Sequence, residues 1–471
     1  MEVRSMHFKA NASAKLADAD LQRNLRTAKG KFVDKRAISI REIDDFEGTR
    51  AAARDLRDRV LKDLDLWLER FETTATARGA TVLWAKDGAE ICRHVVDIAQ
   101  KHGVKKATKS KSMLSEEAGL NHALEAADIQ PVETDLGEYI LQINDNEPPS
   151  HIIAPVMHKN LDEVADLFAK THKKPRKTDI PQLTREAREV LRSHFLSAEM
   201  GISGGNFLVA ETGSVALVTN EGNGRMVTTL PKVHVVITGI EKVIPTLEDL
   251  TLLLRLLPRS ATGQSISNYV SVLTGVKTPE ETDGPEHLYF ILVDNGRADV
   301  VGSEFHDMLR CIRCGACMNH CPVYQTIGGH AYGWVYPGPM GSILTPLYVG
   351  IEHAVDLPQA ATLCGQCSAV CPVMIPLPDL MRTLREKQVD RNLRPLSERL
   401  ALKAWAWVAS KPALYHLGTR FAVRYLKWLA GGSDRIRVLA SAPEWTAGRD
   451  FPAPEGRTFR EMYAAQSRRM G

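Results

Sequence analysis

The sequence contains no run of about 18 uncharged apolar residues, the length that a helix needs to cross a bilayer. Its opening stretch, MEVRSMHFKANASAKLADAD, also lacks the apolar core of a secretory signal. These absences exclude helical membrane proteins and secreted proteins, and we expect a cytoplasmic protein.

Familiar cofactor motifs are also missing. No G-x-G-x-x-G fingerprint stands between a strand and a helix, as dinucleotide binding requires, and no flavin signature is present. The sequence therefore does not identify a group that takes hydride from a substrate.

The composition is that of a globular protein with an uneven distribution of charge. Its 471 residues are 44% hydrophobic and 25% charged, which is typical of soluble proteins, and a chain of this length predicts about three domains. Residues 381–471 carry 18 Lys and Arg against 8 Asp and Glu, a net charge of +10, although the whole chain has only +3. The basic final fifth is therefore where we expect a partner surface.

Cysteine is concentrated in one region. Seven of the eight cysteines lie between positions 311 and 371. Cytosolic thiols stay reduced, so such a cluster indicates metal binding or redox chemistry and not disulfides. Cys92 stands apart in an amphipathic segment, where we expect a small buried side chain without chemistry.

The first cysteine group has the spacing C-x2-C-x2-C-x3-C-P, formed by Cys311, Cys314, Cys317 and Cys321. In two-cluster ferredoxins the first three thiolates of this pattern hold one [4Fe-4S] cluster and the fourth reaches the other cluster. The second group, Cys364, Cys367 and Cys371, also ends in Cys-Pro. The crossing rule then predicts one set of Cys311, Cys314, Cys317 and Cys371, and another set of Cys321, Cys364 and Cys367. A pair of zinc sites is the alternative, but zinc does not require two runs that end in Cys-Pro.

The second set has only three thiolates, because Ala361 occupies the position of its leading cysteine. Two alternatives stay open: a [3Fe-4S] cluster, or a cubane whose fourth iron is held by a non-cysteine group, a water or a partner's ligand. His320, His330 and His353 are close in sequence, although each is also typical of a surface or packing histidine.

The segments outside the cysteines predict three further regions. Residues 1–49 form an N-terminal arm or an early helix. Residues 50–300 alternate helical segments with short β-branched runs, which is typical of an α/β domain with a largely parallel sheet. Strands are predicted at the following runs: 81–85, 151–156, 206–210, 214–219, 232–238 and 287–294. Residues 301–390 hold the cysteines, and 42 residues separate Cys321 from Cys364, a spacing that favours an α-helical ferredoxin module over a compact β-hairpin ferredoxin.

Several motifs together resemble one known family. They are ETDLGEYI at 133–140, ETGSVALVTNEGN at 211–223, DNGR at 294–297 and the cysteine run with its continuation VYQTIGGHAYGWVYPGPMGSILTPL. The sequence is similar to the lactate utilization protein B family over nearly its whole length, including the basic extension at 391–471. The seven-cysteine pattern of that family, with three thiolates for the second cluster, is reproduced here.

The resemblance implies an α/β LUD domain, similar to CoA-transferases and ribose-phosphate isomerases, followed by a two-cluster iron-sulfur module. It implies an electron-carrier subunit, non-catalytic or co-catalytic, in a complex that oxidises L-lactate to pyruvate. The implied partners are a CCG-domain protein and a short LUD-domain protein, and the electron acceptor is not implied. An iron-sulfur subunit for another 2-hydroxy acid such as glycolate, or a redox sensor, is the alternative.

Within the α/β region, some loop residues are candidates for binding a small acid. A carboxylate, hydroxyls and a guanidinium suit such a ligand, and they occur in two neighbouring segments that flank a predicted strand. These candidates are Glu211, Thr212, Ser214, Asn220, Glu221 and Arg225. A hairpin turn explains the same residues equally well. The glycine-rich segment 201–206 predicts a loop, and Lys109, Ser110 and Lys111 indicate either a solvated surface or an anion site.

The basic extension interleaves aromatic and cationic residues. Trp405, Trp407, Phe421, Tyr425 and Trp428 alternate with lysines and arginines over two predicted helices, before a loosely structured tail. Packing on the rest of the chain, docking of a partner subunit and peripheral contact with an anionic membrane all fit this pattern. No nucleic-acid-binding motif accompanies it, and we expect no nucleic-acid partner.

Overall fold

The computed structural model describes residues 2–470, and the side chains of all of these except 28, 29, 444, 469 and 470. The chain forms two compact units, Met1–Gln388 and Val389–Gly471. No helix among the described residues has the length and apolar character that crossing a membrane requires.

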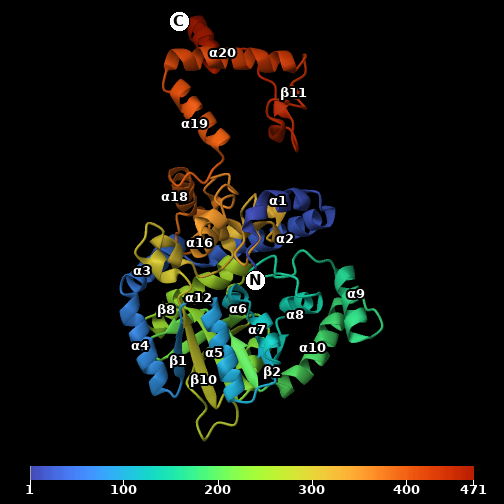
Figure 1. The fold of residues 1–471 in the computed structure, drawn as a ribbon, viewed down its shortest axis with the longest axis vertical. Coiled ribbons are helices and arrows are strands. Elements are labelled where there is room, and N and C mark those ends of the chain that lie inside the picture. The colour runs from blue at the N-terminus through green and yellow to red at the C-terminus, as the bar shows by residue number, and fades with distance from the viewer. Residues whose placement is uncertain (1, 471) are drawn as a thin grey trace. The chain divides into compact units, whose positions relative to one another are not determined.

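A six-stranded parallel sheet is the centre of the first unit, in the order β1-β10-β7-β4-β2-β3 (Figure 1). Its strands are β1 (Thr81–Ala85), β2 (Lys106–Lys109), β3 (Gln130–Glu133), β4 (Met200–Ser203), β7 (Val233–Gly239) and β10 (His287–Val293). Val235 of β7 lies opposite Ile202 of β4 on one side and Tyr289 of β10 on the other. Parallel neighbours need crossover connections, and the intervening helices supply them. The predicted α/β class is confirmed.

The helices of this region are α3 (Phe46–Lys62), α4 (Leu64–Ala77), α5 (Gly88–Lys101), α6 (Met113–Ala118), α7 (Leu120–Ala126), α8 (Leu136–Ile143), α9 (Leu161–His172), α10 (Ile180–Ser197), α11 (Asn223–Thr229), α12 (Leu247–Thr262) and α13 (Arg297–Val301). Of these, α4, α5, α6, α7, α8, α10 and α11 pack against the six-stranded sheet. On α5, Ile91, Val95 and Ile98 recur at helical spacing and join one core cluster with Val235 and Ile291 of the sheet. Each such side chain contributes about 1.5–3 kcal/mol of transfer free energy when it is fully buried.

A second sheet, in the order β8-β5-β6-β9, lies within the same unit. Its strands are β5 (Phe207–Val209), β6 (Ser214–Thr219), β8 (Val243–Ile244) and β9 (Tyr269–Thr274). The β5–β6 pair is an antiparallel hairpin, so the predicted strands at 206–210 and 214–219 are confirmed as neighbours.

Two predictions for the α/β region are wrong. The predicted strand at 151–156 is a series of bends and turns, in which the His151 Nδ1 accepts hydrogen bonds from the backbone N–H groups of Ile153 and Ala154. A side chain that binds nearby backbone groups competes with a strand ladder. The predicted loop at 201–206 begins with strand residues, because β4 extends to Ser203. Only Gly204, Gly205 and Asn206 form the connection.

The cysteine-bearing region is helical, as predicted. Its elements are η4 (His306–Arg310), α14 (Ala316–Asn319), α15 (Tyr324–Ile327), η5 (His330–Tyr332), α16 (Gly338–Val349), η6 (Ile351–His353), α17 (Gln366–Ala369) and α18 (Leu377–Asp390). All residues from 301 to 388 are described, and none of them is in a strand. Figure 1 shows α16 and α18 beyond one end of the sheet strands.

The N-terminal segment is helical and packs on this cysteine-bearing region. It contains η1 (Ser5–His7), α1 (Phe8–Leu16), α2 (Ala19–Ser39) and η2 (Ile40–Glu42). The Phe8 and Tyr332 rings make an edge contact at 5.4 Å, and the Ser5 hydroxyl donates to the Tyr332 carbonyl oxygen at 2.9 Å. Of the two alternatives for residues 1–49, an arm or an early helix, the helical one is therefore present, and it packs on the segment around Tyr332.

The second unit contains α19 (Leu396–Ala409), α20 (Pro412–Leu429) and α21 (Phe459–Met470), with a two-residue ladder between β11 (Arg435–Ile436) and β12 (Phe451–Pro452). The two helices predicted after Pro395 are present. Helix α21 was not expected, since the tail was predicted to be loosely structured. Trp405, Phe421 and Trp428 are 64%, 64% and 74% exposed, so these aromatic rings do not pack in a core.

Candidate iron-sulfur site

Four cysteines from two distant segments surround one small cavity. Cys311 and Cys314 lie between η4 and α14, Cys317 belongs to α14, and Cys371 follows α17. Apolar side chains complete the wall, among them Met308 and Met340. All four thiols are free, so no disulfide uses them.

The remaining three clustered cysteines surround a second cavity. Cys321 reaches it from the first cysteine segment, and Cys364 and Cys367 come from the second segment. Thus each segment gives its last cysteine to the set of the other segment, which is the exchange that the spacing predicts.

The two cysteine segments share a local conformation. Cys314-Gly315 and Cys364-Gly365 each precede a single turn of helix, α14 or α17. Gly315 has φ +76° and Gly365 has φ +82°, a left-handed backbone that other L-residues adopt at a steric cost. Both segments therefore use glycine at the same place, after a cysteine and before the helical turn.

The thiols fit a group that brings positive charge. Burial, followed by the neighbouring Cys321, raises the pKa of the Cys367 thiol to about 12. Burial also raises the pKa of Cys314 and Cys317, with further increases from nearby cysteines. Crowded buried thiols stay protonated unless a cation is present, and a metal centre deprotonates them outright. Four sulfur donors at one cavity and three at the next match the requirements of two iron-sulfur clusters.

Buried cations hold the backbone of the first cysteine set. The Arg36 Nη2 donates to the Val370 carbonyl oxygen at 3.0 Å, and the Arg50 Nη2 donates to the Cys371 carbonyl oxygen at 2.7 Å. From the other side, two further cations donate to carbonyl oxygens: Arg57 to Leu309 at 3.2 Å and Lys242 to Cys311 at 3.3 Å. Among the described residues, those that line the two cavities include no positive side chain. Beside the second set, the Arg50 Nη2 donates to the Ser368 carbonyl oxygen at 3.2 Å, and the Arg385 Nη2 donates to the Ala361 carbonyl oxygen at 3.1 Å. Both cysteine sets therefore have arginines that bind the nearby backbone.

None of the three histidines considered for the second set lines its cavity, within residues 2–470. The lining there includes Ala361, Thr362 and Gln366. The His320 Nδ1 lies 2.9 Å from the Ala316 carbonyl oxygen, and His353 is exposed. A histidine ligand from this chain is therefore not supported by the geometry.

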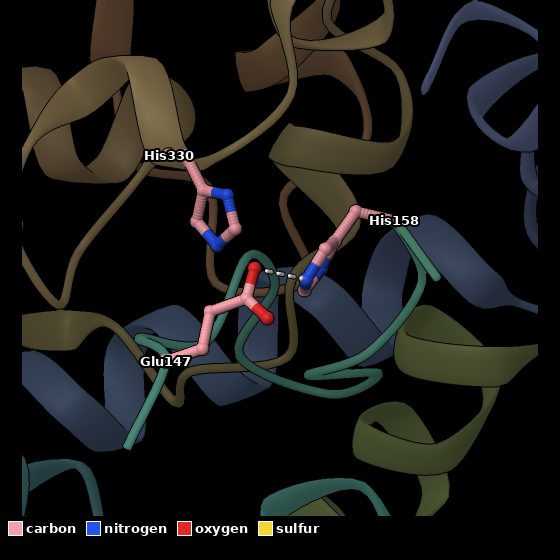
Figure 2. A group of neighbouring side chains, drawn as sticks. All are labelled: Glu147, His158 and His330. Carbon is pink, nitrogen blue, oxygen red and sulfur yellow. Dashed lines mark hydrogen bonds and ion pairs between the residues drawn. The ribbon is translucent and has the colours of Figure 1, made fainter. Parts of the chain in front are cut away.

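His330 instead belongs to a polar group with Glu147 and His158, shown in Figure 2. One Glu147 carboxylate oxygen lies 3.0 Å from the His158 Nε2, and the other accepts from the Lys159 ammonium at 2.6 Å. The His330 Nε2 lies 2.8 Å from the Pro148 carbonyl oxygen. Hydrogen bonds and ion pairs within the protein thus already use the nitrogen and oxygen atoms that would bind a metal ion. The three side chains form a structural network between the α/β domain and the cysteine-bearing region.

The six candidate residues of the α/β domain do not form one site. Glu211, Thr212 and Ser214 lie at the β5–β6 turn, where a Glu211 oxygen accepts from the Leu247 N–H at the start of α12. The Arg225 guanidinium stacks 4.6 Å from the centre of the Tyr269 ring. Only Asn220 and Glu221 line a cavity with other polar groups. The turn explanation is thus favoured for the first three residues.

That cavity has a volume of about 420 Å³ and lies at the carboxyl ends of the central strands. Residues that follow β2, β4 and β7 line one side, and Ile312, Arg313 and Tyr336 of the cysteine-bearing region line the other. In parallel α/β sheets, ligands bind outside the carboxyl ends of the strands. The cavity is therefore the most suitable place for a ligand in this domain.

Four cations line this cavity: Lys111, Lys242, Arg297 and Arg313. The sequence offered an anion site as one of two alternatives for Lys111, and the other three were not identified as binding residues. Each is a single charged residue in a different segment, so only the folded chain reveals that they meet. The neighbouring Lys109 is 1% exposed and pairs with Glu133 at 2.5 Å, which makes it a buried structural residue and not part of a solvated surface.

Glu241 is the buried counter-charge at one end of the cavity. Burial alone would raise its pKa, but Arg297, Lys242 and Arg313 lower it to about 2. Arg297 lies between two carboxylates, at 3.0 Å from Glu241 and 2.8 Å from Glu117. A Cβ atom at Gly239 would collide with the side chains of Glu241 and Arg297, so a larger residue there would displace this ion pair. Burial, followed by repulsion from Arg313, lowers the pKa of Lys242 to about 7.

Comparison with known proteins identifies the family. A relative from Bacillus licheniformis named lactate utilization protein B is 41% identical over 473 residues, which cover 100% of this chain and 99% of that protein. The protein of the same name from Bacillus subtilis is 41% identical, covering 98% of this chain and 97% of its own length. The chain belongs to the lactate utilization protein B family.

Family models divide the chain in agreement with this assignment. Residues 68–293 match the LUD domain, residues 307–375 match a 4Fe-4S dicluster domain, and residues 382–468 match the C-terminal region of lactate utilisation protein B. A solved DUF162 family protein from Deinococcus radiodurans is 12% identical, covering 49% of this chain and 98% of its own, with a TM-score of 0.28. In this member of the family, the dicluster match contains all seven clustered cysteines, and the LUD match contains the strands that border the cavity.

Proposed function

We propose that this chain is the iron-sulfur electron-transfer subunit of a complex that oxidises L-lactate to pyruvate. The exchange of Cys321 and Cys371 between two cysteine sets carries the proposal, because it creates two separate sulfur-lined cavities. The family assignment supports the pathway, since the relatives are named for lactate utilization.

In this proposal Cys311, Cys314, Cys317 and Cys371 hold a [4Fe-4S] cluster. Cys321, Cys364 and Cys367 hold the second cluster, either a [3Fe-4S] cluster or a cubane whose fourth iron has a non-cysteine ligand. When bound, such clusters accept and release electrons one at a time. The chain's own residues keep the sulfur atoms in place, surround the first set with an apolar wall and supply positive charge beside it, whereas Cys364 of the second set is exposed.

Iron and sulfide analysis of the full chain, purified without oxygen, tests the cluster part. We expect about seven to eight irons per chain, from one full cluster and one that is full or lacks an iron. A colourless chain loaded with zinc would refute it. The pathway is tested by adding partners and substrate: L-lactate should reduce the clusters in the reconstituted complex, whereas reduction by glycolate and not by lactate would contradict the choice of substrate.

The partner subunits in the proposal are a CCG-domain protein and a short LUD-domain protein. Exposed aromatic rings on α19 and α20, such as Trp405 and Trp428, support a docking role for the basic second unit. The test is co-purification with both partners from cells. Replacing Trp405 and Trp428 by serine should reduce partner recovery without changing iron content, and unchanged recovery would exclude these rings as contacts.

A further inference from the structure

The cavity of about 420 Å³ lies between the α/β domain and the first cysteine segment. Ile312 lines both this cavity and the adjacent one that contains Cys311, Cys314, Cys317 and Cys371. A molecule in the cavity of about 420 Å³, called the larger cavity below, would therefore be separated from the first sulfur set by little more than a single turn of the chain.

The cations at this end of the cavity are not balanced by acids. Arg297 is neutralised by its two carboxylates, Glu117 and Glu241. Arg313 has only a 3.5 Å contact with Glu241, which already bonds Arg297. Lys242, 8% exposed, donates to a carbonyl oxygen of the cysteine segment. An excess of positive charge away from water is costly unless an anion compensates it.

Arg313 and Lys242 line the larger cavity and do not line the sulfur cavity. Arg313 also has φ +58°, a left-handed backbone conformation that is strained for a residue with a side chain. Glycine would adopt this backbone conformation without strain, but the position between Cys311 and Cys314 is occupied by an arginine. Strained residues of this kind concentrate at ligand-binding positions.

Uncharged polar groups also line the cavity, as do the acids Asp135, which pairs with Lys111 at 3.6 Å, and Glu221. Ser110 and Ser112 follow β2, Asn206 follows β4, and Thr238 belongs to the end of β7. Hydroxyl and amide groups are suitable partners for the hydroxyl or oxo oxygen next to a carboxylate, while lysine and arginine bind the carboxylate itself.

We propose that this cavity binds a small 2-hydroxy or 2-oxo monocarboxylate, with its carboxylate at Lys242 and Arg313. This inference rests on the proposed function for the choice of acid, but not for the existence of the site. It assigns substrate or product binding to the iron-sulfur chain itself. The cavity exceeds the size of a three-carbon acid, so we expect ordered water beside the ligand and acceptance of longer 2-hydroxy acids.

Anaerobic calorimetry on the full chain, with iron measured on the same samples, tests the site. Pyruvate and L-lactate should bind with a stoichiometry of one, and propionate, which lacks the second oxygen, should bind more weakly. Inorganic phosphate separates a specific acid site from a general anion site. Equal affinity for phosphate and pyruvate would overturn the proposed ligand class.

Three variants locate the binding. Lys242→Met should weaken pyruvate binding about tenfold or more, because a charge-assisted bond is lost. Lys111→Met, which replaces a cavity lysine that pairs with Asp135 at 3.6 Å, should weaken it by a smaller factor and serves as the second test should Lys242→Met lose iron. Lys232→Met is the matched control, since this exposed lysine precedes β7 at its amino end.

Two results would overturn the inference: no binding of organic acids by an iron-loaded chain, or wild-type affinity in both cavity variants. The first result leaves the proposed function intact. A chain that binds pyruvate but carries zinc in place of iron refutes only the proposed function.

Discussion

The Arg50 guanidinium donates two hydrogen bonds to the carbonyl oxygen of Cys371, at 2.9 Å from Nε and 2.7 Å from Nη2. The two residues are 321 positions apart in the sequence. Helix α3 thus fixes the one cysteine that the first set receives from the second segment, and it brings a buried positive charge to that set.

Arg50→Met removes this charge and both hydrogen bonds. We expect a more negative reduction potential for the cluster of the first set, because nearby positive charge favours the added electron. The buried carbonyl left without its donor should cost about 1–3 kcal/mol of stability. Redox titration followed by electron paramagnetic resonance measures the potential.

Arg59→Met is the control for that experiment. Arg59 belongs to the same helix, but its side chain is 68% exposed. An iron-loaded Arg50→Met chain with the same potential as Arg59→Met would show that Arg50 has only a structural role.

Single cysteine substitutions should remove different clusters. Cys371→Ala should affect the cluster of Cys311, Cys314 and Cys317, whereas Cys321→Ala should affect the cluster of Cys364 and Cys367. Each variant should lose about half of the iron, with a different remaining spectrum. Cys92→Ala, outside both cavities, should keep all of it. Identical spectra for Cys371→Ala and Cys364→Ala would contradict the exchange.

His234 makes stability dependent on pH. It is 1% exposed in β7, where its Nε2 lies 2.8 Å from the Ser203 hydroxyl, and burial lowers its pKa to about 3. Because the pKa is lower in the folded state, stability is complete above pH 6.5 and falls as the pH drops toward 3. The loss should be about 1.4 kcal/mol for each pH unit well below the unfolded pKa.

Melting temperatures of the wild type and His234→Gln at pH 7.0 and 5.5 measure this effect. The wild type should lose more stability than the variant between the two conditions. His122→Gln, with a side chain that is 77% exposed, is the control and should behave like the wild type. Parallel losses in all three chains would rule out His234 as the cause.

The Glu147, His158 and His330 group should behave as a structural network. Burial opposes ionisation of Glu147, but hydrogen bonds from His158 and Lys159 hold its pKa well below the ordinary value. Glu147→Gln should therefore lower stability by about 1 kcal/mol, a modest value because the group is partly solvated. Added Zn²⁺ should not raise the melting temperature of the iron-loaded wild type. A Zn²⁺-dependent increase that Glu147→Gln abolishes would show a metal site instead.

Much of the architecture could be predicted from local patterns. The β-branched runs at 81–85, 214–219 and 287–294 could be predicted as strands, because the apolar pattern of a buried strand differs from the period of the helices between them. Four-residue strands such as β2 and β3 were too short for a period to show. The run at 151–156 failed for another reason, since His151 binds the backbone that a strand ladder would have used.

The sequence by itself predicted the two cysteine sets, and their assignment to two clusters stays a prediction. Their spacing and the Cys-Gly turns are local properties, so seven positions were sufficient to group the thiols. Only the tertiary structure decided what surrounds them. Arg36 and Arg50 come from the N-terminal helices, Lys242 follows β7, and Arg313 lies between two cysteines, and no local period relates such single charges. These cations converge beside one sulfur set and one cavity only through long-range packing. Packing therefore decides the charge around the cysteines, the burial of their thiols and the access of a ligand to the cavity.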